Sequence, residues 1–93
     1  TEGRDAQDVL NPATGAVLGS LPLATVADLD RALEAAERGF HAWRKTAPQE
    51  RAAVLSRTAA LVRERADSLA ALATMEEGKP QAEAKGEVMA TAA

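Results

Sequence analysis

Four groups of residues in this sequence could take part in binding or catalysis. They are a glycine–lysine pair, several glutamates, one histidine and three serines. The pair Gly78-Lys79 matters most, because phosphate-binding loops end in glycine and lysine. Such a loop also needs an earlier glycine where this chain has Ala73, and Ser or Thr where it has Pro80. We therefore predict that Gly78 ends one helix and that Pro80 lies in the first turn of the next.

The glutamates and the histidine predict no catalytic pair. Glu76 and Glu77 are neighbours in a predicted helix, so their carboxylates point in different directions. Glu83 and Glu87 share a helix face, but two glutamates without further ligands do not make a specific cation site. His41 is the single histidine and has no cysteine or second histidine with which to hold a metal.

The hydroxyl and thiol groups offer no nucleophile either. Ser20, Ser56 and Ser68 lack a general base to activate them. The chain has no cysteine, which excludes disulfides, thiolate metal ligands and a cysteine nucleophile. The sequence therefore assigns no catalytic residue and no cofactor-binding residue.

The elements that position these side chains begin with a predicted β-hairpin. Apolar residues flank the segment Asn-Pro-Ala-Thr-Gly and predict antiparallel strands at Asp8–Leu10 and Ala16–Leu23. The proline suits the second position of a type I turn, and Gly15 suits a left-handed conformation that closes it.

A long amphipathic helix follows over Val26–Arg44. Thr25 is its predicted N-cap, and Asp28 completes an acidic version of the capping box. Apolar residues recur at alternating steps of three and four, which places them on one helix face. These residues are Val26, Leu29, Leu33, Ala36, Phe40 and Trp43.

Residues 48–77 predict either one long helix or two helices nearly in line. Pro48 fits the first turn, with Thr46 or Ala47 as the cap. Asp67 could cap a second helix after a slight bend. A further alanine-rich helix follows Pro80, so the predicted fold is mainly α: a β-hairpin followed by three to four helices.

Composition limits what the chain can be. It has 93 residues, of which 46% are hydrophobic, but 23 are alanine, so a core built from the larger apolar residues would be thin. A net charge of −3 argues against nucleic-acid binding, and no apolar run is long enough for a membrane span. We expect a polar lead at residues 1–7 and a partial domain at residues 8–93 that is truncated at its C-terminus.

Several motifs occur in the order found in the aldehyde dehydrogenase family. They are "NPATG", "GFHAW", the "PQERA" start of a helix, and "EEGKP" followed by "EAKGEV". Over residues 8–93 the chain resembles the N-terminal segment of such an enzyme, with most similarity to the succinate-semialdehyde dehydrogenase branch.

The resemblance implies a fold and an activity for a longer parent. Such enzymes oxidise an aldehyde with NAD or NADP and a cysteine nucleophile; succinate semialdehyde is one candidate substrate, and the sequence does not determine which aldehyde is used. The nucleophile, the glutamate base and the cofactor sheet lie beyond this segment, which packs around the cofactor-binding domain of an α/β enzyme. The expected partners are therefore the remainder of the parent chain and further copies of it in a homo-oligomer, with no cofactor on this chain itself and a cytoplasmic location.

The resemblance also implies one candidate ion site. Some members of the family hold a structural monovalent cation near the hairpin and the helix after Gly-Lys-Pro. The candidates here are the Glu87 carboxylate and the backbone of Val9 and Leu10. An alternative to the dehydrogenase fragment is a free-standing helical interaction module that uses the apolar stripe of Val26, Leu29, Leu33, Phe40 and Trp43.

Overall fold

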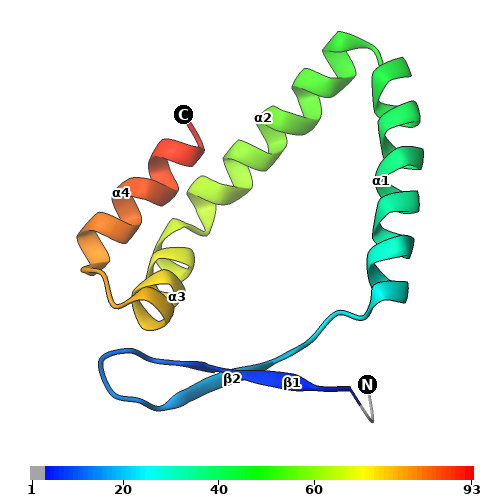
Figure 1. Ribbon diagram of the computed structural model, residues 1–93. Coiled ribbons are helices and arrows are strands. Elements are labelled where there is room, and N and C mark those ends of the chain that lie inside the picture. Colours follow the sequence, from blue (N-terminus) through cyan, green and yellow to red (C-terminus); the bar gives the residue numbers. More distant parts are fainter. Residues whose placement is uncertain (1–3) are drawn as a thin grey trace.

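The structure, a computed structural model, describes residues 4–93 as a β-hairpin followed by four helices (Figure 1). This order confirms the fold class predicted from the sequence. The predicted polar lead at residues 1–7 lies partly outside the described residues, because residues 1–3 are not described. Within the described part, Ala6 and Gln7 already belong to the first strand, so the lead is shorter than predicted.

The hairpin pairs β1, Ala6–Leu10, with β2, Val17–Pro22, in antiparallel orientation. Its first strand starts two residues earlier than predicted, because Ala6 and Gln7 find partners on β2 that the alternation of apolar residues does not reveal. The register shifts between Val9 and Leu10, so β2 carries an extra residue there, as in a β-bulge.

The turn of the hairpin is closed by its own polar groups. The backbone N–H of Asn11 donates to the Ala16 carbonyl at 2.8 Å, and the Gly15 N–H donates to the Asn11 carbonyl at 2.8 Å. The Asn11 side chain accepts from the Ala13 N–H at 2.9 Å. Gly15 has a φ of 72°, which confirms the predicted left-handed glycine.

Helix α1 spans Val26–Lys45 and begins as predicted. The Thr25 hydroxyl accepts from the Asp28 N–H at 3.2 Å, and the Asp28 carboxylate accepts from the Thr25 N–H at 2.9 Å. This reciprocal capping box satisfies two N–H groups that have no partner within the helix. Arg44 and Lys45 lie in the last turn, where positive charges interact favourably with the helix dipole.

The segment 48–77 forms two helices rather than one: α2, Pro48–Glu64, and α3, Ala66–Glu77. Pro48 is the first residue of α2 and Ala47 is its N-cap, one of the two predicted caps. The proposed cap at Asp67 is wrong, because α3 begins after Arg65 without a side-chain cap. Asp67 Oδ1 instead forms an ion pair with Lys85 Nζ at 2.7 Å.

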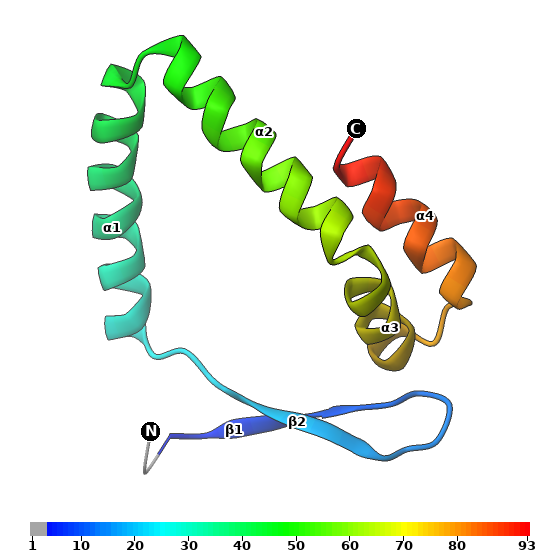
Figure 2. The ribbon, with the colours of Figure 1, turned by 180° about the vertical axis from the view of Figure 1, so that it is seen from behind.

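Helix α4, Gln81–Thr91, folds back on α3 and lies beside α2 (Figure 2). Pro80 is its N-cap residue, one position before the predicted first turn. Among the described residues the buried apolar side chains are all alanines. They are Ala66, Ala70, Ala84 and Ala92. The absence of larger groups at these positions lets α3 and α4 approach closely.

The chain is open rather than closed around a core. Its radius of gyration is 17.5 Å, against about 12 Å for a compact domain of this length. Helix α1 stands apart from the α3–α4 pair and joins α2 only through the turn at residues 46–47 (Figure 1). Within residues 4–93, no helix combines the length and apolar character needed to cross a bilayer.

Candidate functional site

The joint between α3 and α4 is the place where the sequence concentrates groups that could act on a ligand. Gly78 ends α3 with a φ of 79°, and its N–H donates to the Thr74 carbonyl at 2.9 Å. This geometry confirms the predicted helix end. A phosphate-binding loop would need a strand before the glycine, and here the preceding element is α3.

Lys79 follows that glycine and lies between two carboxylates. Its Nζ atom lies 3.0 Å from Glu77 Oε2 and 2.6 Å from Glu87 Oε2. The hydrogen bond to Glu87, and then the one to Glu77, raise the pKa of Lys79 to about 12. The ammonium therefore stays charged, but its charge is balanced by two acids of the same chain.

This arrangement joins the end of α3 to the middle of α4. The Lys79 side chain is only 24% exposed, whereas Glu77 and Glu87 are mostly exposed. The two glutamates take two of the three N–H donors of the ammonium, and their negative charges would repel a phosphate or carboxylate ligand. Lys79 therefore links the end of α3 to the middle of α4, and its charge is paired within the chain.

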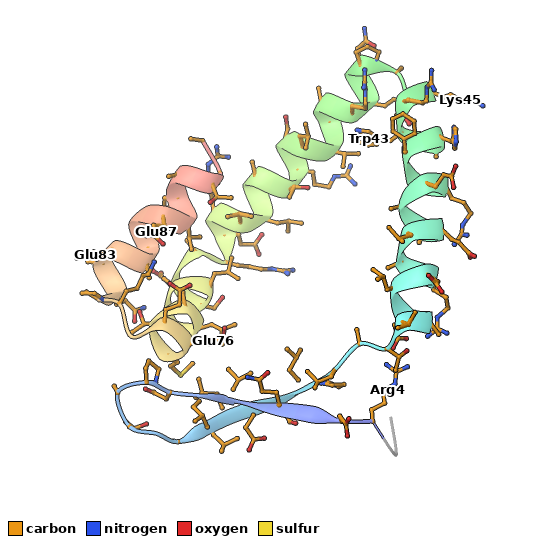
Figure 3. All side chains as sticks on the ribbon, in the orientation of Figure 1. Arg4, Trp43, Lys45, Glu76, Glu83 and Glu87 are labelled. Carbon is orange, nitrogen blue, oxygen red and sulfur yellow. The ribbon has the colours of Figure 1, made fainter. Side chains whose placement is uncertain are left out.

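The other predicted acids do not converge on a common point. Figure 3 shows Glu83 and Glu87 on α4 and Glu76 at the end of α3 near the hairpin. His41 is 58% exposed on α1, and its Nε2 atom lies 3.9 Å from Glu37 Oε1. In the part of the chain that the structure describes, no group of three or more His, Cys, Asp or Glu residues is arranged to hold a metal ion.

The cation predicted at Glu87 with the backbone of Val9 and Leu10 stays a prediction. Glu87 Oε2 already accepts the Lys79 ammonium, so a metal ion there would have to share or replace that partner. Val9 and Leu10 lie at the register shift of the hairpin, where regular pairing is interrupted.

Among the described residues, no serine hydroxyl donates a hydrogen bond to a histidine, aspartate or glutamate. Ser68 donates to the Arg65 carbonyl at 2.9 Å, which is a local helix contact. Ser56 lines an open cavity of about 350 Å³ between α2 and the end of α4, with Arg63 as its charged residue. Ser20 lines a second cavity of about 180 Å³ between β2 and α3, next to Glu76. Ser20 and Glu76 line the same cavity, but no hydrogen bond joins the hydroxyl to the carboxylate.

One polar cluster was missed by the sequence reading. Asp28 Oδ1 forms an ion pair with Arg4 Nη2 at 3.1 Å and a second ion pair with Arg31. The hydrogen bond from the Thr25 backbone, followed by the one from the Thr25 hydroxyl, lowers the pKa of Asp28 to about 2. Arg4 comes from before β1, so the cluster ties the start of the hairpin to the start of α1. Periodicity could not reveal it, because the two residues are 24 positions apart.

This chain has no phosphate-binding motif of the kind that holds many nicotinamide cofactors. The sequence lacks a glycine-rich turn between a strand and a helix, which is where such cofactors place their phosphates. The one glycine–lysine pair lies between two helices, with its lysine held by Glu77 and Glu87. The ion pairs between elements join the start of the hairpin to α1, and α3 to α4.

The chain is similar to part of several known enzymes. Glutarate-semialdehyde dehydrogenase of Pseudomonas putida is 50% identical over 80 residues, which cover 86% of this chain and 17% of that protein. The NADP-dependent succinate-semialdehyde dehydrogenase of Escherichia coli K12 is 46% identical over 84 residues, covering 90% of this chain and 17% of that protein. The chain thus spans about a sixth of the length of these relatives.

Solved structures of such enzymes also superimpose on this chain over a small part of their length. A crystal structure described as an E. coli NADP-dependent enzyme superimposes with a TM-score of 0.91 at 45% identity, over 95% of this chain and 18% of that chain. Succinate-semialdehyde dehydrogenase from Burkholderia pseudomallei gives a TM-score of 0.86 at 45% identity, over 90% of this chain and 17% of that chain. The family model that matches is described as the aldehyde dehydrogenase family, and it covers residues 1–93. This chain belongs to the aldehyde dehydrogenase family.

Proposed function

We propose that this chain is the N-terminal segment of a semialdehyde dehydrogenase that oxidises a carboxylated aldehyde to its diacid with NAD or NADP. The observation that carries the proposal is the similarity to enzymes named for glutarate, malonate and succinate semialdehyde, each covered over less than a fifth of its length. The segment contributes a hairpin and packing helices, and the reacting groups belong to the rest of the polypeptide. Such an enzyme would act in the cytoplasm as a homo-oligomer.

The division of labour follows from the residues present. Thiohemiacetal formation needs a thiolate, and this chain has no cysteine. The lysine and glutamates at the α3–α4 joint are paired with each other and hold two helices together. The names of two similar proteins mention NADP, which favours NADP as the first cofactor to test.

A chimera tests the proposal. In the E. coli succinate-semialdehyde dehydrogenase, the matching segment is replaced by this chain, so that the host supplies every reacting group. We expect the chimera to reduce NADP with succinate semialdehyde at a rate within about ten-fold of the host, because the scaffold geometry is shared. A folded, soluble chimera without activity would contradict the proposal. The 93-residue chain alone, with the three semialdehydes and either cofactor, should give no reduced nicotinamide above the blank.

A second function is favoured by one specific observation. The apolar residues of α1 remain uncovered, and their exposed fractions range from 42% at Trp43 to 76% at Val26. A free-standing interaction module would use this stripe to bind a partner. The chimera distinguishes the two functions, because an interaction module would not restore a dehydrogenase that lacks its own segment.

A further inference from the structure

We draw no further inference here: the strongest candidate, the exposed apolar side of α1 between Val26 and Trp43, is a surface that the longer polypeptide proposed above would cover, and nothing in the structure shows another occupant.

Discussion

Pro12 in the hairpin turn lies directly against Gly78 at the end of α3. A Cβ at position 78 would be 3.0 Å from Pro12 Cγ and 3.8 Å from Pro12 Cβ. Gly78 therefore has two reasons to be glycine: its φ of 79° and the close approach of the proline. This contact fixes the tip of the hairpin on the joint that Lys79 holds together.

Gly78→Ala should lower the free energy of unfolding by about 1–2 kcal/mol, because a left-handed alanine is strained and Pro12 must also move. Gly15→Ala is the matched control, since Gly15 has a φ of 72° but nothing within 4 Å of its would-be Cβ. Urea unfolding followed by helical circular dichroism measures both. Adding Pro12→Ala to Gly78→Ala should remove the excess over the control. An equal loss in the two single variants would mean that the proline contact has no energetic effect.

The capping box of α1 should make the helix sensitive to acid. The pKa of Asp28 is about 2 in the folded chain, against an ordinary value of 3.8. Because the folded pKa is the lower one, the stabilisation is complete above about pH 4 and is lost as the pH falls through about 2. Circular dichroism across this range should show loss of helix, and Asp28→Asn should abolish that part of the transition. Asp30→Asn is the control, because Asp30 lies outside the capping box, and it should retain the transition.

The α3–α4 joint should be sensitive to alkali for the opposite reason. The pKa of Lys79 is raised from 10.5 to about 12 by Glu87 and Glu77. A raised pKa gives a stabilisation that is complete below pH 10.5 and lost as the pH rises through about 12. Lys79→Gln should remove this alkaline transition from the unfolding curve, whereas Lys45→Gln, in the last turn of α1, should keep it. A transition that persists in Lys79→Gln would assign it to another group.

Thr74 offers a stabilising substitution. Its hydroxyl is buried and has no hydrogen-bond partner among the described residues. Thr74→Val keeps the shape and removes the unsatisfied group, so it should raise the free energy of unfolding by about 0.5–1 kcal/mol. Thr58→Val is the control, because the Thr58 hydroxyl donates to the Val54 carbonyl at 2.9 Å. The control should be neutral or destabilising, and a Thr74 variant that behaves the same way would show that its hydroxyl is satisfied by solvent.

The local structure of this chain could be predicted from the sequence because it depends on short-range rules. The box of Thr25 and Asp28 starts α1, Gly15 closes the turn, and Gly78 ends α3, each through groups at most a few residues apart. The rejection of a phosphate loop at Gly78-Lys79 followed from the same local reasoning. The apolar period of α1 likewise required only helical geometry.

Tertiary structure decided how these elements meet. The partners of Lys79, the contact of Pro12 with Gly78, and the ion pair of Arg4 with Asp28 join residues that no sequence period connects. The sequence left one or two helices open for residues 48–77, and the structure breaks the segment at Arg65, where α3 turns to pack its alanines on α4. The exposure of the apolar side of α1 also depends on tertiary structure. Amphipathic spacing shows which side of a helix is apolar, but it does not show whether other elements pack against that side.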